Sequence, residues 1–269
     1  MSEQLPLVIS PEQLEPLLGD ADLLVLDLAK PTTYQQMHVP GAIFLDYGRI
    51  VEVRQPVAGL LPATDQLEKV FSEIGIDGRQ VVVYDDEGGG KAGRLIWTLH
   101  ALGYQSVSLL DGGLHAWANE RHPMQRDAVR PIASEFKAVM DESVIADAEF
   151  VRSHLDDGQL KLLDARSIGE YTGAQRYSAN AGHIPGAIHW DWVDLMNRER
   201  NLRLHSPEEL LAGLKQRGIV LEDEVVCYCQ THHRSSLSYV VLRYLGMERV
   251  RGYPGSWSDW GNRPDLPVE

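Results

Sequence analysis

The stretch LLVLDLAKPTTYQQMHVPGAIFLD, residues 23–46, returns later in the chain as LKLLDARSIGEYTGAQRYSANAGHIPGAIHWD, residues 160–191. Both copies carry an apolar run that ends in Asp, followed by His-x-Pro-Gly-Ala. The segments that follow also correspond: QVVVYDDEGGGKAGRLIWTLHALGYQSVSLLDGGLHAW (80–117) pairs with EVVCYCQTHHRSSLSYVVLRYLGMERVRGYPGSWSDW (224–260). Internal self-similarity of this length indicates one fold used twice.

The apolar runs predict the type of sheet. Four of them are short and continuous rather than alternating, which is typical of parallel strands covered on both faces; they are 23–28, 81–84, 160–163 and 225–228. Between them, apolar residues recur at helical spacing, and these patterns stop at Gly103 and Gly246. Strand and helix alternate, so each half is predicted to be an α/β domain with helices on both faces of a parallel sheet.

The domain boundaries follow from a change in composition. Residues 123–135 mix Pro, Arg, Asp and Ala without a sustained period, which predicts a linker. The expected organisation is therefore an amino-terminal domain over 1–122 and a carboxy-terminal domain over 136–269. A chain of 269 residues is long enough for two such domains.

Composition narrows the class of protein. With 43% hydrophobic and 24% charged residues and no run of eighteen apolar residues, the chain is typical of soluble globular proteins. A formal charge of −14 argues against broad binding to nucleic acid or anionic lipid. The first residues, MSEQLPLVIS, do not resemble a secretory signal, so we expect a cytoplasmic protein without a membrane association. The two cysteines, Cys227 and Cys229, are too few and too close for a disulfide framework.

The segment CQTHHR, residues 229–234, is the strongest candidate for a functional site. Ligands of open α/β sheets bind beyond the carboxyl ends of the strands, and Cys229 stands at that point. If a helix begins near Arg234 or Ser235, the free N–H groups of its first turn point into the loop that Cys229 opens. An ordinary thiol is about 3% thiolate at neutral pH, because its pKa is about 8.5. The helix dipole, Arg234 and a protonated histidine would raise that fraction, so Cys229 is predicted to be a thiolate nucleophile.

At these residues the sequence resembles the two-domain rhodaneses, and the resemblance covers both halves. Tyr34-x3-His38-Val39-Pro40-Gly41-Ala42 is similar to the amino-terminal signature of that family. Gly252-Tyr253-Pro254-Gly255-Ser256-Trp257 is similar to the carboxy-terminal one, and CQTHHR to the loop of bacterial two-domain members. The resemblance implies a sulfurtransferase that moves a sulfane sulfur from thiosulfate, or a similar donor, through a Cys229 persulfide to cyanide or a thiol.

The resemblance also assigns roles to the loop and its surroundings. Cys229 is the expected catalytic residue, and the substrate-binding candidates are Gln230, Thr231, His232, His233 and Arg234. The supporting candidates are Ser235 and an ion pair between Asp164 and Arg166 that braces the loop. His38 and His183 are expected to be hydrogen-bonding turn residues. Vertebrate rhodaneses carry basic residues where Thr231 and Glu170 stand here, so donor selection is left to His232, His233 and Arg234.

The amino-terminal half is predicted to be a non-catalytic copy. Aligning Tyr84 with Tyr228 places Asp85 opposite Cys229, and DDEGGGKAGR offers carboxylates where an anion would need cations. We expect no cofactor and no metal, because the spacing C-x-C-x2-H-H, from Cys227 to His233, fits no common structural zinc pattern. The expected partners are a small sulfur donor and a thiophilic acceptor, including a thiol protein, and the tandem copies favour a monomer.

Two other functions remain open from the residues. A cysteine phosphatase uses the spacing Cys-x5-Arg-[Ser/Thr], whereas this loop has Cys-x4-Arg-Ser. A non-enzymatic sulfur-carrier or binding module is the second alternative, and the intact Cys229 argues against it.

Overall fold

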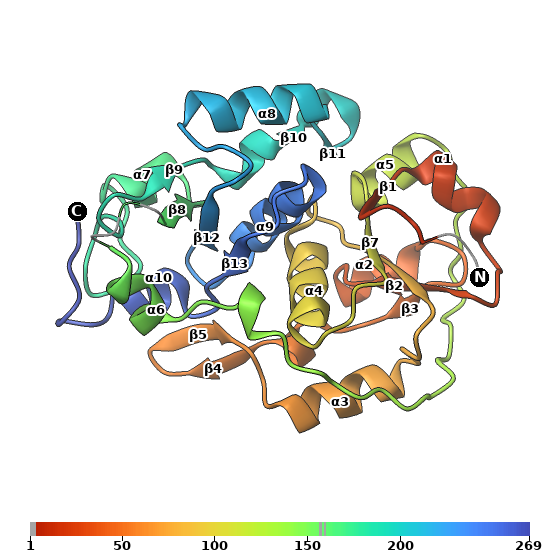
Figure 1. The fold of residues 1–269 in the computed structure, drawn as a ribbon. Helices are drawn as coiled ribbons and strands as arrows, with labels where there is room; N and C mark the ends of the chain where they lie inside the picture. The colour runs from red at the N-terminus through yellow and green to blue at the C-terminus, as the bar shows by residue number, and fades with distance from the viewer. Residues whose placement is uncertain (1–3, 156–157, 159) are drawn as a thin grey trace. The chain divides into compact units, whose positions relative to one another are not determined.

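The computed structural model describes residues 4–155, 158 and 160–269. By backbone contacts the chain divides into two units of similar size. The first unit comprises 1–50, 62–140 and 196–204, and the second comprises 51–61, 141–195 and 205–269. Figure 1 shows the two sets of elements along the chain, from red to blue.

The first unit contains a five-stranded parallel sheet in the order β1-β7-β6-β2-β3. Its strands are β1 (Val8–Ile9), β2 (Leu23–Asp27), β3 (Ile43–Phe44), β6 (Gln80–Tyr84) and β7 (Val107–Leu110), with the separate pair β10 (Met196–Asn197) and β11 (Arg203–Leu204). Its helices are α1 (Pro11–Leu14), α2 (Pro31–Gln36), α3 (Thr64–Glu73), α4 (Gly90–Ala101) and α5 (Gly113–Asn119).

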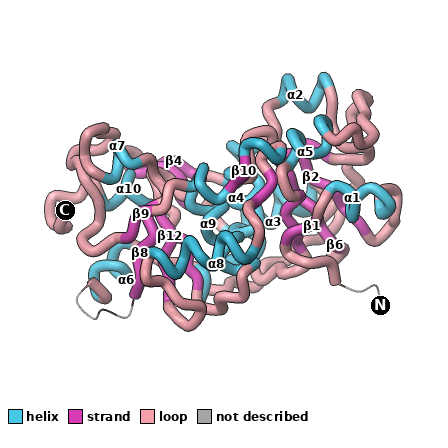
Figure 2. The backbone as a smooth tube through the Cα atoms, turned by 90° about the horizontal axis from the view of Figure 1, so that it is seen from above, coloured by secondary structure: helices cyan, strands magenta, loops and turns pink. Residues whose placement is uncertain are grey.

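The second unit has a four-stranded parallel sheet in the order β13-β12-β8-β9. Figure 2 shows β8, β9 and β12 of this sheet side by side in magenta. Its strands are β8 (Leu160–Asp164), β9 (Ile188–His189), β12 (Glu224–Tyr228) and β13 (Val250–Gly252), with the separate hairpin β4 (Glu52–Arg54) and β5 (Val57–Leu60). Its helices are α6 (Ala148–Ser153), α7 (Ile168–Tyr171), α8 (Pro207–Gln216), α9 (Arg234–Tyr244) and α10 (Ser256–Trp260).

The four runs predicted as central strands are paired in this way, β2 beside β6 and β8 beside β12, although Lys161 interrupts the apolar run of β8. Their side chains are almost all buried, because helices cover the sheets. Leu162, Val226 and Tyr228 pack in one core with Trp257 and Trp260. Burying apolar surface stabilises the fold by about 25 cal/mol per Å². The burial of these large side chains therefore holds the end of β12, where the cysteine loop begins, in place.

The helices begin and end where the sequence indicates. Helix α9 starts at Arg234, as predicted, and Gly246 follows its end with a φ of 93°. That left-handed conformation suits glycine and closes the helix. Within the described residues, none of the helices combines the length and the apolarity that crossing a bilayer requires.

The segment predicted as a linker forms neither helix nor extended strand, but it packs against the first unit. His38 and Gln125 exchange backbone hydrogen bonds, and Ser134 N–H donates to the carbonyl of Ser72. The first unit continues to residue 140 before the chain enters the second.

Each unit takes one hairpin from the sequence of the other repeat. The β4–β5 hairpin, in 51–61, lies in the second unit, and the β10–β11 pair, in 196–204, lies in the first. The two segments start five residues after Asp46 and Asp191, which are the ends of the repeated stretch. The repeats therefore exchange equivalent hairpins, a feature that the sequence pattern did not predict.

Candidate active site

The cysteine loop is placed by a strand and a helix of the second unit. Strand β12 ends at Tyr228, and Cys229 follows directly, before α9 begins at Arg234. The residue Cys229 has no exposed surface.

Hydrogen-bond donors converge on the sulfur of Cys229. The N–H groups of Thr231 and Ser235 and the hydroxyl of Ser235 all interact with it, and the charge of Arg234 lies close. Burial alone would raise the pKa of the Cys229 thiol, but Arg234 and these hydrogen bonds together hold the pKa below its ordinary value. The arrangement therefore stabilises a thiolate, which is the nucleophilic form.

Cys227 differs from Cys229 although it is only two residues away. Burial in the sheet, together with the nearby charge of Cys229, raises the pKa of Cys227 far above its usual range. It stays a neutral thiol that fills space in the core.

Arg234 is held by a carboxylate. Its Nη1 donates to Glu170 Oε2 at 2.6 Å and its Nη2 to Glu170 Oε1 at 2.8 Å. Burial of Glu170 opposes its ionisation, yet these bonds and the charge of Arg234 lower its pKa to about 2. The guanidinium therefore interacts with two groups that can be anionic, the Glu170 carboxylate and the Cys229 sulfur.

Ser256, at the start of α10, fixes the backbone of the loop. Its hydroxyl oxygen accepts from the N–H groups of Cys229 at 3.2 Å and His232 at 3.0 Å. It also donates to the carbonyl of Tyr253 at 2.7 Å. Ser256 has a φ of 49° and His232 a φ of 51°, so both are non-glycine residues in the left-handed region. Ser256 lies in the carboxy-terminal signature, but its residue type alone does not indicate this role.

The exchanged β4–β5 hairpin supports the loop from another direction. A Cβ atom at Gly59 would lie 2.1 Å from the carbonyl oxygen of Thr231, and Gly59 has a φ of 80°. Ser258, in α10, accepts from Ala58 N–H and donates to Ala58 C=O, each at 3.0 Å. No signal in the cysteine loop itself could have predicted this contact, because the hairpin is 170 residues away in sequence (229 minus 59).

The remaining loop side chains point in different directions. Gln230 Nε2 donates to Ser178 Oγ at 3.2 Å. His232 is fully buried, and its Nδ1 lies 2.8 Å from Ser235 Oγ. His233 is partly exposed, and its ring centre is 6.4 Å from that of Trp192. The structure thus brings together all six residues of the predicted loop, with His232 turned inward.

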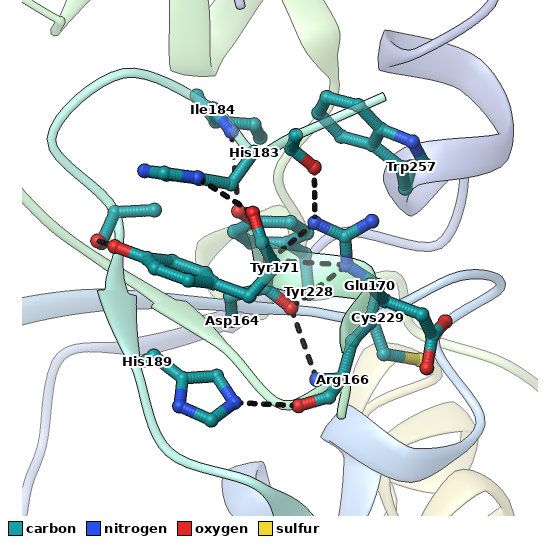
Figure 3. A network of polar contacts seen from close by, with 12 residues as sticks. Asp164, Arg166, Glu170, Tyr171, His183, Ile184, His189, Tyr228, Cys229 and Trp257 are labelled. Carbon is teal, nitrogen blue, oxygen red and sulfur yellow. Dashed lines mark hydrogen bonds and ion pairs between the residues drawn. The ribbon is translucent and has the colours of Figure 1, made fainter. Parts of the chain in front are cut away.

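The ion pair between Asp164 and Arg166 is present and buried, as Figure 3 shows. Arg166 Nη2 lies 2.6 Å from Asp164 Oδ2 and also donates to the carbonyl of Gly182 at 2.8 Å. The guanidinium stacks 4.5 Å from the centre of the Trp257 ring. Arg166 therefore joins the end of β8 to α10, and both elements adjoin the cysteine loop.

The turn histidines are equivalent in the two repeats. His38 Nδ1 lies 2.7 Å from the carbonyl of Tyr34, and His183 Nδ1 lies 2.9 Å from that of Tyr171. Each imidazole also stacks on its tyrosine, at 4.0 and 3.7 Å. They hold their turns, as expected.

In the first unit, a carboxylate occupies the position of the cysteine. Asp85 Oδ1 accepts from the N–H groups of Glu87, Gly88 and Gly89 at 2.8–3.1 Å, and its Oδ2 accepts from Ala92 N–H at 2.9 Å. This loop is filled by its own side chain. It presents a carboxylate in place of a thiol, and these four N–H groups are already bonded.

Clusters of metal-ligating side chains are rare in the described part of the chain. The one that could hold an ion is Glu12, Glu120 and His122, in the first unit. Arg203 already bonds to both glutamates there. Cys227, Cys229, His232 and His233 do not form such a cluster.

Comparison with known proteins identifies the family of this chain. The rhodanese-like domain family matches twice, over residues 10–120 and 147–263. The chain belongs to the rhodanese family. A thiosulfate sulfurtransferase of Pseudomonas aeruginosa is 42% identical, with 98% of this chain and 97% of the relative covered. One from Azotobacter vinelandii is 41% identical over the same shares. Sulfur transfer is the activity that these relatives and the family support.

A solved structure shares the fold of this rhodanese. The anaerobic ergothioneine biosynthesis enzyme from Chlorobium limicola matches with a TM-score of 0.86 at 24% identity. The match covers 99% of this chain and 71% of that enzyme. At this identity the likeness concerns the fold alone.

Proposed function

We propose that this rhodanese is a thiosulfate:cyanide sulfurtransferase whose catalytic residue is Cys229, in an active-site loop of the bacterial two-domain type, CQTHHR. The observation that carries the proposal is the convergence of two backbone N–H groups, a hydroxyl and a guanidinium on one sulfur. Such a cradle stabilises negative charge on sulfur, both in the thiolate and in a persulfide.

The reaction would proceed in two balanced steps. The Cys229 thiolate attacks the outer sulfur of thiosulfate; the new S–S bond forms as the S–S bond of the donor breaks, and sulfite leaves with the electron pair. Cyanide then attacks the terminal sulfur of the persulfide, forms thiocyanate and restores the thiolate. A small thiol or a cysteine of another protein would take the same position as cyanide.

The other loop residues have supporting roles in this proposal. Gln230, Thr231, His232, His233 and Arg234 contact the donor or its leaving group. Ser235 and the Asp164–Arg166 pair hold the loop in place. The two repeats, 1–122 and 136–269, remain our proposed domains, with 123–135 as their connection, and we propose a cytoplasmic monomer.

The rival functions have less support. A phosphatase loop would have one more residue between Cys229 and the arginine. Hydrolysis of an aryl phosphate that requires Cys229 would contradict the proposal. A sulfur-carrier module without turnover would accept sulfur but release none to cyanide.

The test is intact-mass spectrometry of the full chain before and after thiosulfate. We expect a gain of one sulfur atom that is lost on addition of cyanide, with thiocyanate appearing in solution. Cys229→Ser should show no gain, and Cys227→Ala should behave like the natural chain. A natural chain that gains no sulfur from any sulfane donor would refute the proposal.

A further inference from the structure

The bidentate pair between Glu170 and Arg234 has a consequence for the charge of the site. Only 7% of the Glu170 side chain is exposed, against 23% of Arg234. The exposed part of the guanidinium is thus where an external anion could approach. The chain has already paired this cation with an anion of its own.

Glu170 is fixed on its own helix as well. Its Oε2 accepts from the N–H of Ser167 at 3.2 Å and from its hydroxyl at 2.9 Å, which forms the capping box of α7. The carboxylate therefore does not need to move to meet Arg234. It is positioned by the helix start before any donor arrives.

The charges around Cys229 sum to a negative value. Among the described residues at this site, Arg166 is balanced by Asp164 and Arg234 by Glu170. The negative charge of the Cys229 thiolate is then left without a cation in either of these pairs. Asp191 also interacts electrostatically with Arg234, and as an acidic residue it cannot offset the negative charge of the site. A dianionic donor is repelled more strongly than a monoanionic one by such a site.

We propose that Glu170 is a specificity-determining residue, which acts through Arg234 to disfavour sulfur donors in proportion to their negative charge. Thiosulfate still serves as a donor, but sulfane compounds with one negative charge or none are accordingly used more efficiently. This inference rests on the proposed sulfur transfer at Cys229 and concerns which donor serves it. Glu170 is a positioning residue in this proposal, since it touches Arg234 and not the reacting sulfur.

The experiment compares two donors that differ by one charge. Persulfide formation is measured with thiosulfate, a dianion, and with benzenethiosulfonate, a monoanion, for the natural chain and for Glu170→Gln. Glutamine also serves in a capping box, so α7 keeps its start. We expect kcat/KM for thiosulfate to rise about tenfold relative to benzenethiosulfonate, mainly through a lower KM for thiosulfate.

The chain offers a matched control. Glu209 forms the same capping box with Ser206 at the start of α8, and the side chain beside its carboxylate is His205 instead of a loop arginine. Glu209→Gln should leave the ratio of the two donors unchanged. Glu170→Asp, which keeps the charge near Arg234, should retain part of the discrimination.

The outcomes separate this inference from the proposed function. An equal change with both donors in Glu170→Gln, or no change, would overturn the role of Glu170 while sulfur transfer stands. No persulfide with either donor in the natural chain would instead overturn the proposed function. If the Gln variant does not fold, the salt dependence of kcat/KM for the two donors, measured on the natural chain, tests the repulsion instead. Added KCl should raise kcat/KM for thiosulfate relative to benzenethiosulfonate, because it screens repulsion, and a fall would contradict the proposal.

Discussion

At the end of β6 the first side chain of the loop is Asp85, and at the end of β12 it is Cys229. Both residues are fully buried, and backbone N–H groups of the following loop point at both side chains. In the first unit the carboxylate of Asp85 satisfies four of these donors permanently. In the second, the donors surround a sulfur whose charge depends on its pKa.

The two loops also differ in the positive charges beside them: the second unit has two arginines where the first unit has uncharged residues. Position 234 carries an arginine, whereas its counterpart Gly90 carries no side chain. Arg166 follows Asp164 by two residues, whereas Ala29 stands at the same distance after Asp27. The same arrangement of strand, loop and helix therefore forms a loop filled by its own carboxylate in the first unit and a cysteine loop in the second. The difference lies in a few side chains.

The largest expected effect comes from making the catalytic loop resemble the other. Cys229→Asp should lose about a thousandfold or more in sulfur transfer, because a carboxylate cannot form a persulfide. The same variant should melt no lower than Cys229→Ala, since the carboxylate accepts the loop N–H groups and lies near Arg234. Turnover assays and thermal melting check both parts. A Cys229→Asp chain that is less stable than Cys229→Ala would break the analogy between the loops.

The second prediction concerns Asp27, the aspartate that ends β2. Burial raises the pKa of Asp27 to about 6, against the hydrogen bonds from Tyr84 and Ala29 that favour its charge. A raised pKa means that the folded chain prefers the protonated acid. Its stabilising contribution is therefore present below about pH 4 and is lost as the pH rises through about 6.

Asp27→Asn removes this titration. Its free energy of unfolding, relative to that of the natural chain, should increase by about 2–3 kcal/mol between pH 4 and pH 7. Urea unfolding at several pH values measures this difference. A constant difference across the range would show that Asp27 does not titrate in this way.

The third prediction tests the self-filled loop of the first unit. Asp85→Asn replaces one accepting oxygen with an NH2 group that cannot accept from Ala92 N–H, so a buried donor is left unpaired. We expect a loss of about 1–3 kcal/mol in the free energy of unfolding, with sulfur transfer per folded molecule unchanged. Asp65→Asn, at an exposed position of α3, is the control. Equal stability of the two variants would argue against the role of Asp85.

The smallest effect is expected from the hairpin under the cysteine loop. Gly59→Ala places a methyl group against the carbonyl of Thr231, so the loop must shift and sulfur transfer should fall about tenfold. Gly41→Ala is a matched control, because Gly41 also has a positive φ of 79° but a Cβ there meets nothing within 4 Å. Equal activity of the two variants would show that the loop does not depend on the hairpin. Donor titrations of both variants separate KM from kcat.

Local patterns predicted much of this molecule. The continuous apolar runs identified β2, β6, β8 and β12, since strands buried on both faces need no polar alternation. The repeat placed Asp85 opposite Cys229, and the helix start at Arg234 followed from the position of the loop.

The contacts that fix the loop were not predictable in this way. Ser256 and Gly59 reach the loop through folding of distant segments, and neither residue type signals its partner. The sequence predicts that Arg234 acts beside Cys229, but only the proximity of α7 shows that Glu170 is its partner. Periodicity reports which face of an element is buried, but not which distant segment covers it.

The exchange of hairpins also sets the order in which the chain can be completed during synthesis. Residues 51–61 leave the ribosome early, yet their packing partners in the second unit are made some 170 residues later. Likewise, the first unit awaits residues 196–204, one of which, Met196, would meet a Cβ at Gly88 in the Asp85 loop. The nascent amino-terminal half is therefore incomplete until most of the second repeat has emerged. If the gene were divided at the connecting segment, each of the two fragments would lack the hairpin that packs against its own loop.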